Sequence, residues 1–370
     1  MPDGQRATGG HRMSQPSAHG AARYRADELA ALARALLERA GLPQDKAGDV
    51  AEVLVAGDLL GKSTHGLALL PLYLREIESG GMTAAGEPEI LNDIGACQTW
   101  DGRKLPGPWL ARRATAEAIA RARHFGLGAV AIQRSHHTAC LGAYLQPAID
   151  AGCLMLLTLT DPGHSSVAPF GGVTPVLTSN PIAFGAPAPD APILIDMSTA
   201  LMTNGGVAAY RQRGESLPHP FLMDAEGRPS TDPNVIAADP PGSILPLGGL
   251  EAGHKGFSIG LIVELLTGCL AGRGRAEGGD GWSAAVFILV MDPAAFGGTE
   301  NFNRQVKILA ERCHAAQPRP GFDHVDLPGA HALARRERQM RDGVQLSAGI
   351  VAGLTASAAR FDQPMPAAIA

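Results

Sequence analysis

The stretch Leu-Gly-Ala-Val-Ala-Ile-Gln-Arg-Ser-His-His, residues 127–137, begins as an apolar run typical of a buried strand and stops at two histidines. A second apolar run, residues 192–195, stops at Asp196. Open α/β sheets place their reacting groups beyond the carboxyl ends of strands. A histidine and a carboxylate in those positions could form an acid–base pair. The two runs therefore predict an enzyme built on a sheet.

Helices and strands alternate around these runs, and this alternation indicates an α/β fold. Further strands are expected at 153–160, 182–186 and 284–291, and helices at 109–124 and 141–151. Both ends of the chain have the leucine spacing of helices. We expect a mainly helical domain from residues 25–100 with 318–370, an α/β domain at 101–317, and a disordered tail at 1–24.

Composition excludes several classes of protein. The chain has 370 residues, of which 45% are hydrophobic and 18% charged, as in globular domains. A net charge of −5 argues against nucleic acid as the partner. No apolar run reaches the length of a membrane span. The five cysteines are scattered without a Cys-x-x-Cys pair, which favours a reduced, cytoplasmic location.

His137 is the first candidate for catalysis. A neutral imidazole can accept a hydroxyl proton and return it near neutral pH. Asp196 would be a plausible partner for its other nitrogen. An equally good interpretation makes His136 and His137 loop residues bonded to the backbone. Adjacent side chains of an extended segment point to opposite sides, so one of the two is expected to be central.

Two further segments carry polar groups suited to catalysis or ligand binding. His65 lies in Ser-Thr-His-Gly, residues 63–66, where Ser63 or Thr64 could instead cap the next helix. The glycine-rich segment 248–256 contains Lys255 and leads into an apolar helix. Such a segment suits a phosphate, because helix N-termini favour anions. The alternative is an ordinary glycine-rich turn with a solvated lysine.

The motifs, in their order along the chain, resemble the malate/L-lactate dehydrogenase family of the second, non-Rossmann type. They are Ser-Thr-His-Gly (63–66), Ser-His-His (135–137), Val-Ala-Pro-Phe-Gly-Gly (167–172), Ser-Asn-Pro-Ile-Ala-Phe (179–184), Ile-Asp-Met-Ser-Thr (195–199), Ser-Thr-Asp-Pro (230–233), Gly-His-Lys-Gly (253–256) and Leu-Pro-Gly (327–329). The resemblance covers about residues 25 to 360. It implies a three-layer fold with a central mixed sheet and helical regions from both chain ends. It also implies a homodimer that uses NAD or NADP.

Residue by residue, the resemblance makes His137 and His65 catalytic and places Asp196 beside the imidazole and the nicotinamide. Asp196 is expected to orient His137, while His65 contacts the substrate or supplies the proton itself. The expected substrate contacts are Ser63, Thr64 and His65. The expected cofactor contacts are Lys255, His254, Asn180, Pro181, Asp161, Met197 and Ser198.

The chain also departs from the family pattern. An arginine suited to a substrate carboxylate commonly follows the Ser-His-Gly motif, but residues 67–70 are Leu-Ala-Leu-Leu and no cation precedes Arg75. Many members have a lysine where this chain has Gly205-Gly206, and His136 replaces an asparagine. The departures indicate an unusual 2-oxo or 2-imino acid, or another way of holding its carboxylate.

The sequence thus predicts an NAD(P)-dependent oxidoreductase acting at C2 of a small 2-hydroxy acid, 2-oxo acid or cyclic 2-imino acid. One alternative is a metal-dependent lyase or hydrolase, although the spacing of its four histidines matches no compact metal motif. Its ligands would be His65, His137, His164 and His254. Another is a non-catalytic binding protein, which the missing arginine and lysine would suit.

Overall fold

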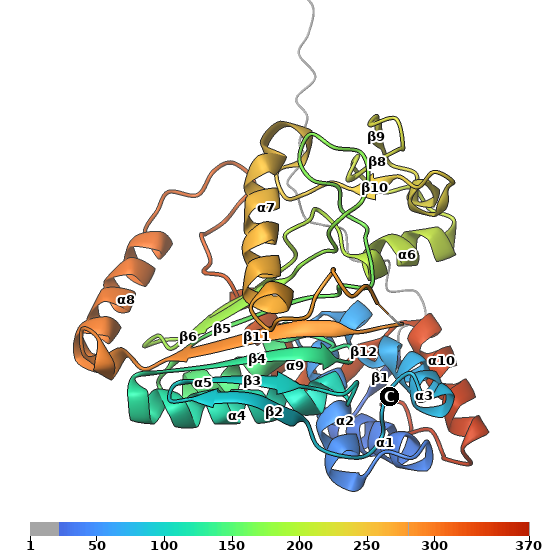
Figure 1. Ribbon diagram of the computed structural model, residues 1–370, viewed down its shortest axis with the longest axis horizontal. Coiled ribbons are helices and arrows are strands. Elements are labelled where there is room, and N and C mark those ends of the chain that lie inside the picture. The colour runs from blue at the N-terminus through green and yellow to red at the C-terminus, as the bar shows by residue number, and fades with distance from the viewer. Residues whose placement is uncertain (1–21, 280, 370) are drawn as a thin grey trace, which may run out of the picture.

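The centre of the molecule is a seven-stranded sheet in the order β2-β3-β4-β11-β5-β6-β7 (Figure 1). The structure is a computed structural model that describes residues 22–279 and 281–369. β3 runs parallel to β4, and the other neighbouring pairs are antiparallel. The predicted α/β fold with a central mixed sheet is confirmed. The strands are β2 (Glu89–Ile94), β3 (Cys97–Asp101), β4 (Leu127–Ser135), β5 (Leu154–Thr160), β6 (Ile182–Ala186), β7 (Ile193–Met197) and β11 (Ala284–Met291).

Helices cover the sheet on two sides and give it three layers (Figure 1). α4 (Gly107–Phe125) and α5 (Gln146–Asp150) lie on one face. α4 packs closely because it presents the small buried residues Ala114 and Ala118. α7 (Gly249–Glu264) approaches the other face and ends in the π-helical turn η5 (Leu265–Cys269), which contacts β4, β5 and β11.

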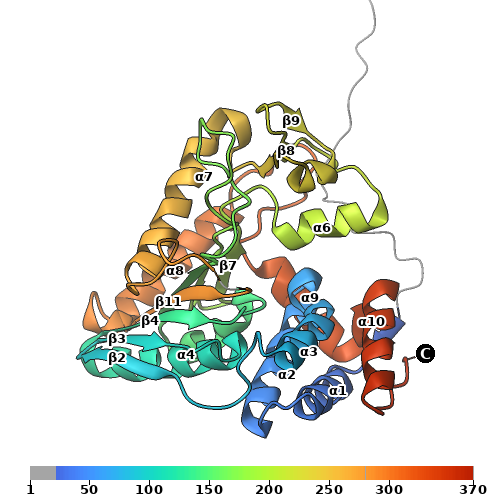
Figure 2. The same cartoon turned by 45° about the vertical axis from the view of Figure 1, so that its right-hand side comes forward.

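Both ends of the chain contribute to a helical region beside the sheet (Figure 2). Its helices are α1 (Ala26–Arg39), α2 (Gln44–Leu59), α3 (Leu70–Ser79), α9 (Ala330–Asp342) and α10 (Ala348–Arg360). The short strands β1 (Ala22–Tyr24) and β12 (Val344–Leu346) pair antiparallel and join the two ends. Residues 22–24, which we expected in the tail, therefore form a strand. Residues 1–21 of that expected tail lie outside the described residues.

Three segments differ from the expectations. Residues 89–101, expected in the helical domain, form β2 and β3 of the sheet. β2 is exposed along its whole length, and its apolar residues Ile90, Leu91 and Ile94 do not alternate with polar ones as they do in a typical strand. The expected helix at 141–151 is split into η3 (Leu141–Tyr144) and α5, whose first turn contains Pro147. The helix expected from about Lys255 begins at Gly249.

A smaller unit lies above the sheet at the upper right of Figure 1. It has its own apolar cluster, which includes Val167, Val207 and Ile244. Its elements are α6 (Asn204–Arg213), β8 (Leu222–Met223), β9 (Pro229–Ser230), η4 (Pro233–Ala237) and β10 (Ser243–Ile244). The remaining elements of the chain are η1 (Ser63–His65), η2 (Leu67–Leu69), η6 (Pro293–Ala295) and α8 (Thr299–His314).

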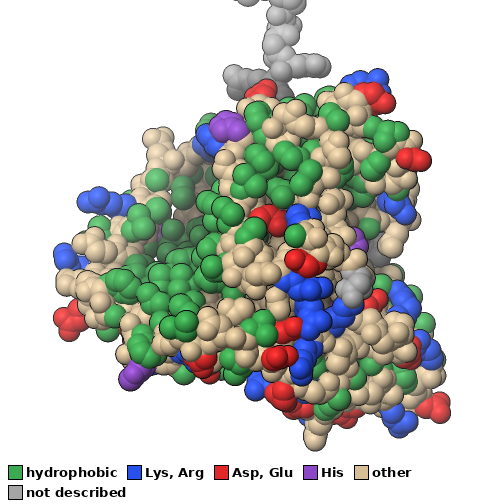
Figure 3. Space-filling view, in the orientation of Figure 1, with side chains coloured by type: hydrophobic (Ala, Val, Ile, Leu, Met, Phe, Trp, Pro, Cys, Tyr) green, Lys and Arg blue, Asp and Glu red, His purple; other side chains and the backbone are tan. Residues whose placement is uncertain are grey.

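Apolar side chains of α7 and of the turn η5 that follows it are exposed on the side that faces away from the core. Leu265 is 62% exposed and Ile262 is 51% exposed. Figure 3 shows hydrophobic side chains gathered between α7 and α8 on this side of the molecule. Among the helices of the described residues, none is both long and apolar enough to cross a membrane.

The direction of the strands positions the site. β4, β5 and β7 run the same way, because each is separated from the next by one antiparallel strand. Their carboxyl ends therefore meet at one edge of the sheet. His137, Asp161 and Asp196 all follow or end these strands at that edge.

Candidate functional site

The turn that carries His65 is held against α2. A Cβ atom on Gly57 would lie 2.7 Å from the carbonyl oxygen of His65, and one on Gly66 would lie 2.4 Å from the carboxylate of Asp58. The same carboxylate accepts the backbone N–H of Leu67 at 2.7 Å. Two glycines and one buried acid therefore fix the position of the turn. Burial raises the pKa of Asp58 to about 7.

His65 and His137 come together, as the sequence predicted for an active site. Their rings are stacked with centroids 5.9 Å apart and an interplanar angle of 23°. Trp282 lies on the ring of His137 at 4.3 Å between centroids. The pair is thus enclosed by an aromatic side chain that the sequence analysis did not single out.

The first ring nitrogen of His137 is held by Tyr73 of α3. The Tyr73 hydroxyl lies 2.8 Å from Nδ1 and 3.1 Å from the carbonyl oxygen of His137, and the N–H of Ala139 lies 3.2 Å from Nδ1. A hydroxyl both donates and accepts, so Nδ1 has a partner in either tautomer. When Nδ1 is protonated it donates to Tyr73, which donates to the carbonyl. Nε2 can accept a proton only in this tautomer, in which the Ala139 N–H no longer has Nδ1 as its acceptor.

The second nitrogen of His137 is available to a ligand. Within residues 22–279 and 281–369, no group hydrogen-bonds Nε2. Burial and the neighbouring imidazoles of His65 and His136 hold the pKa of His137 well below its ordinary value. Burial also lowers the pKa of His65, while the charge of Asp196 opposes that shift and Lys62 adds to it. Both rings are therefore neutral bases at pH 7.

His136 points away from its neighbour and has a structural partner. It is fully buried, and its Nε2 lies 3.3 Å from a carboxylate oxygen of Glu76. Burial lowers its pKa despite that carboxylate. Of the two adjacent histidines, His137 is the one beside His65, as the sequence predicted.

Asp196 does not orient His137, in contrast to the prediction. Its carboxylate accepts the backbone N–H of Gly142 at 3.0 Å and lies 3.5 Å from the sulfur of Cys140. The reason is the strand order, because β7 is the edge strand and is not a neighbour of β4, and the Asp196 carboxylate meets the segment 140–142 instead. Tyr73 takes the orienting position instead.

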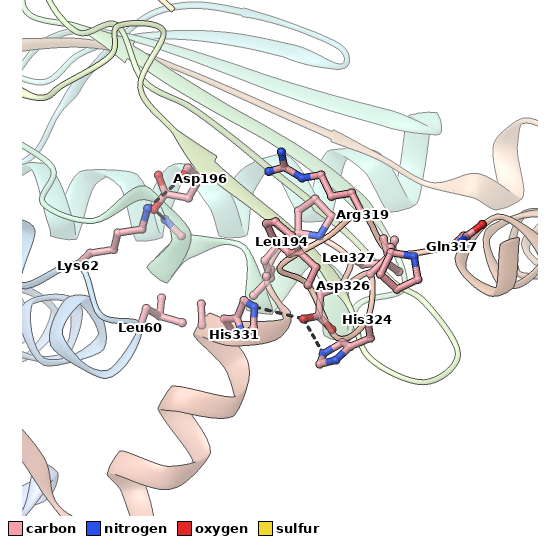
Figure 4. A pocket seen from close by; sticks show the side chains of 17 residues that line it. Leu60, Lys62, Leu194, Asp196, Gln317, Arg319, His324, Asp326, Leu327 and His331 are labelled. Carbon is pink, nitrogen blue, oxygen red and sulfur yellow. Dashed lines mark hydrogen bonds and ion pairs between the residues drawn. The ribbon is translucent and has the colours of Figure 1, made fainter. Parts of the chain in front are cut away.

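A pocket of about 780 Å³ opens beside Asp196 (Figure 4). Binding sites for small molecules have volumes of about 300–1,000 Å³. Lys62 and Asp196 lie at one side of the pocket, and Arg319, His331 and the start of α9 at the other. Asp326 pairs with the imidazole of His331 at 3.2 Å, and with that of His324 at 3.0 Å. The pocket thus combines cations with a helix N-terminus, a donor set that suits a ligand with anionic groups.

The side chain of Asn180 is used inside the protein. It is buried, donates to Glu264 at 2.8 Å and to the Gly260 carbonyl at 3.1 Å, and accepts from Thr160 at 2.9 Å. Arg275 donates to the same glutamate at 2.7 Å. These bonds tie α7 to the end of β5. The predicted cofactor contact of Asn180 is therefore not available to its amide group.

The remaining residues predicted to contact cofactor or substrate differ in their hydrogen bonds and exposure. Asp161 pairs with His164 at 2.8 Å, and this hydrogen bond raises the pKa of that histidine. The Ser198 hydroxyl donates to the Ser179 carbonyl at 3.0 Å. Met197 ends β7, and Ser63 and Thr64 are exposed in η1. The carbonyl of Pro181 accepts from Thr158 at 2.7 Å.

Lys255 and His254 lie on the first two turns of α7 and are exposed. The segment that we expected as a phosphate-binding loop is therefore mostly helix. Gly256 is needed because a Cβ atom there would lie 2.4 Å from the backbone nitrogen of Leu247. Neither Lys255 nor His254 lines the pocket beside Asp196. Their contacts with a cofactor stay predictions.

Three residues near the site were missed by sequence reasoning: Lys62, Tyr73 and Trp282. Tyr73 was noted only as an apolar residue of a helix, and its position opposite His137 depends on tertiary packing. Lys62 directly precedes the Ser-Thr-His-Gly motif, and that adjacency was a usable signal. Trp282 follows a glycine-rich stretch and carries no local signal.

The histidines considered as metal ligands do not converge. In the described part of the chain, no group of three His, Cys, Asp or Glu side chains could hold a metal ion. His164 pairs with Asp161, and His254 packs against Phe170 at 5.6 Å between rings. The structure gives no support to the metal-dependent alternative.

Comparison with known proteins completes the description. The family model described as malate/L-lactate dehydrogenase matches residues 24–355. The chain is 32% identical to the L-lactate dehydrogenase of Cupriavidus necator, over 91% of this chain and 97% of the relative. It is 31% identical to the Delta(1)-pyrroline-2-carboxylate reductase of Ancylobacter novellus, over 89% and 95%. The solved malate dehydrogenase of Pyrococcus horikoshii superposes with a TM-score of 0.84 at 25% identity, covering 94% of this chain and 97% of that one.

Proposed function

Since the chain belongs to the malate/L-lactate dehydrogenase family, a family of oxidoreductases that act on hydroxy acids, we propose that it is a nicotinamide-dependent dehydrogenase or reductase. It moves a hydride between NAD(H) or NADP(H) and C2 of a small 2-hydroxy or 2-oxo acid, or of a cyclic 2-imino acid. The observation that carries this proposal is the stacked pair His65 and His137, with Nε2 of His137 free of protein partners among the described residues.

His137 exchanges the proton that accompanies the hydride. In the oxidation direction its neutral Nε2 takes the proton from the substrate hydroxyl, because its low pKa keeps it unprotonated at pH 7. Nδ1–H then donates to Tyr73, and the phenol donates to the carbonyl of His137. In the reduction direction Nε2 returns the proton to the oxygen or nitrogen on C2.

His65 contacts the substrate from the stacked ring. Its Nδ1 lies 3.0 Å from the hydroxyl of Thr64, so that hydroxyl holds the ring in place. Asp196 acts on this histidine and not on His137, because its negative charge favours the imidazolium of His65. We propose His65 as the second group that exchanges a proton, with Asp196 stabilising its charged form during that exchange.

The pocket beside Asp196 is suited to the anionic part of the cofactor. Its lining includes the guanidinium of Arg319, the imidazole of His331 and the first residues of α9. Phosphate groups bind to such sets, since the helix N-terminus and the guanidinium offer donors to anions. When bound there, the nicotinamide dinucleotide would supply or accept the hydride. The substrate panel described below, run with both NADH and NADPH, decides which of the two cofactors is used.

We also propose that the protein acts as a homodimer in the cytoplasm. Leu156, Phe184 and Ile195 lie opposite one another in the sheet register and are only half-buried, whereas Leu157 and Ala183 on the other face are fully buried. These side chains and the exposed Leu265 are apolar surface of the kind that marks interaction sites. A second copy would cover it. The described cysteines are free thiols, which suits a reducing compartment.

A substrate panel tests the proposal. Purified protein would be mixed with NADH or NADPH and a series of 2-oxo acids and cyclic 2-imino acids, and oxidation of the cofactor followed by absorbance. Saturable oxidation with at least one acid is expected, and it should disappear in the His137→Ala variant. A wild-type protein that turns over no acid with either cofactor would contradict the proposal.

A further inference from the structure

The site has no cation at the position of the arginine that the family pattern offers to a substrate carboxylate, nor at the position where many members carry a lysine. Residues 67–70 form η2 and the start of α3, and Leu67 and Leu70 are buried in the core. Gly205 lies beside the turn of His65, since a Cβ atom there would be 3.6 Å from Cβ of Thr64, but it carries no charge. A carboxylate that leaves water needs a charged or hydrogen-bonding partner. A different donor must therefore face the substrate, and a cation elsewhere in the site is the first candidate.

Lys62 is close to the required position. It precedes the Ser-Thr-His-Gly motif, and its Nζ donates to the carbonyl oxygen of Asp196 at 2.9 Å. Figure 4 shows the side chain extending to Asp196 across one side of the pocket. Its charge reaches His65, because it lowers the pKa of that imidazole. One lysine thus lines the pocket, bonds to Asp196 and acts electrostatically on His65.

The ammonium group of Lys62 has donors to spare. It carries three N–H donors, and the Asp196 carbonyl is its one hydrogen-bond acceptor among the residues that the structure describes. The side chain is half-buried, so an anion bound there would be partly screened from water. A charge-assisted hydrogen bond to a carboxylate is about twice as strong as a neutral one.

We propose that Lys62 binds the carboxylate of the substrate and so replaces the arginine and lysine that the family pattern places elsewhere. The proposal rests on the proposed function, because it assumes a 2-oxo or 2-imino acid. The carboxylate is held by Nζ from the N-terminal side of the His65 turn. C2 then lies toward the stacked histidines. Lys62 is a binding and specificity-determining residue and transfers no proton.

Arg319 is the other cation of this pocket, but it is less suited to the role. It is exposed, and its guanidinium stacks on Phe322 at 4.6 Å. It lies across the pocket from Asp196 and is therefore placed for the cofactor rather than for C2.

The test compares Lys62→Met, which keeps the aliphatic stem, with Lys62→Arg, which keeps the charge. Lys307→Met is the matched control, because Lys307 is exposed on α8 and pairs with Glu311 at 3.9 Å. We expect Lys62→Met to raise KM for the accepted acid by about 10- to 100-fold with a smaller change in kcat. KM for the neutral amide of the same acid should not change. Lys62→Arg should recover most of the affinity, and Lys307→Met should behave as wild type.

A binding measurement separates this inference from the proposed function. Oxamate, a carboxylate similar in shape to pyruvate, would be titrated calorimetrically into each variant, with thermal melting as a check on folding. Oxamate should bind to wild type and lose affinity in Lys62→Met by the same factor as the substrate. Unchanged KM and oxamate affinity in Lys62→Met would overturn the inference, as would a loss of kcat alone. Failure of the wild type to turn over any acid would contradict the proposed function, while oxamate binding would still decide the role of Lys62.

Discussion

The hydroxyl of Tyr73 lies 2.8 Å from Nδ1 of His137, in the position where the sequence predicted the carboxylate of Asp196. The difference matters because a carboxylate stabilises the imidazolium cation, whereas a phenol is neutral. Burial raises the pKa of Tyr73 well above its ordinary value, so the phenol keeps its proton. His137 is thus oriented without being made more basic, which agrees with its lowered pKa.

Replacement of Tyr73 by Phe should lower kcat by about 5- to 30-fold, because one orienting hydrogen bond is worth about 1–2 kcal/mol. The ring still fills its buried space, so thermal stability should change little. Steady-state kinetics and melting curves check this. An unchanged kcat would mean that the Tyr73 hydroxyl does not orient the imidazole.

Replacement of His137 by Ala should lower kcat by about 10²–10⁴-fold, the usual contribution of a positioned acid–base group. His124→Ala, on the exposed side of α4, is the control and should keep full activity. His65→Ala is expected to affect KM as well as kcat. Full turnover in His137→Ala with loss in His65→Ala would make His65 the base.

The pH dependence of hydroxy-acid oxidation should reflect the low pKa of His137. The ring must be neutral to accept the proton, and burial keeps it neutral below the ordinary histidine pKa of about 6.5. We expect kcat/KM to stay level from pH 8 to about pH 6.5 and to fall only below that. An acid limb centred at pH 7 or above would contradict the assignment.

Asp58 should make the protein less stable as pH rises from about 4 to 7. The folded protein holds this proton up to about pH 7, whereas an unfolded chain releases it near pH 4. Between these values the folded state binds more protons, so the free energy of unfolding falls, by up to about 4 kcal/mol at about 1.4 kcal/mol per pKa unit. Asp58→Asn removes this titration and keeps an oxygen for the Leu67 N–H.

We therefore expect Asp58→Asn to be more stable than wild type above pH 7 in urea unfolding. Asp190→Asn, an exposed site, is the control and should follow the wild-type curve. Equal slopes of stability against pH in wild type and Asp58→Asn would refute the role of this carboxyl.

A charge on the exposed apolar surface should weaken the proposed dimer. Leu265→Asp places a carboxylate where the side chain is already 62% exposed, so the monomer should fold normally. Analytical ultracentrifugation should show a dimer for wild type and a shift toward monomer for the variant. Leu91→Asp, on the opposite edge strand β2, should stay dimeric. A monomeric wild-type protein would contradict the proposed homodimer.

Local patterns in the sequence predicted much of the fold. β4, β5 and β11 are continuous apolar runs, and α1 and α4 repeat apolar residues every three to four positions, so their positions were predictable. β2 was not predictable, because it is exposed, its apolar residues do not alternate with polar ones, and it owes its place to pairing with β3. Tertiary pairing decides such strands more than propensity does.

The site divides in the same way. The motif around His65 and the strand end at His137 could be found, because their residue types already suit acid–base chemistry. The partner of His137 could not be found, since Tyr73 comes from a helix more than sixty positions away and is indistinguishable in sequence from a core residue. Asp196 was predicted at the correct end of the sheet, but its predicted contact with His137 was wrong. The sequence of a single segment does not show which strands are neighbours in the sheet.

The pocket is assembled from distant parts of the polypeptide, with Lys62 from the beginning, Asp196 from the middle and His331 from near the end. The loop before α9 also covers β7, since the N–H of Leu194 donates to the Pro328 carbonyl at 3.1 Å. During synthesis the last of these segments leaves the ribosome when most of the sheet is already made. A chain interrupted before residue 327 would expose the edge of β7 to other unfinished chains and would possess only half of its binding site.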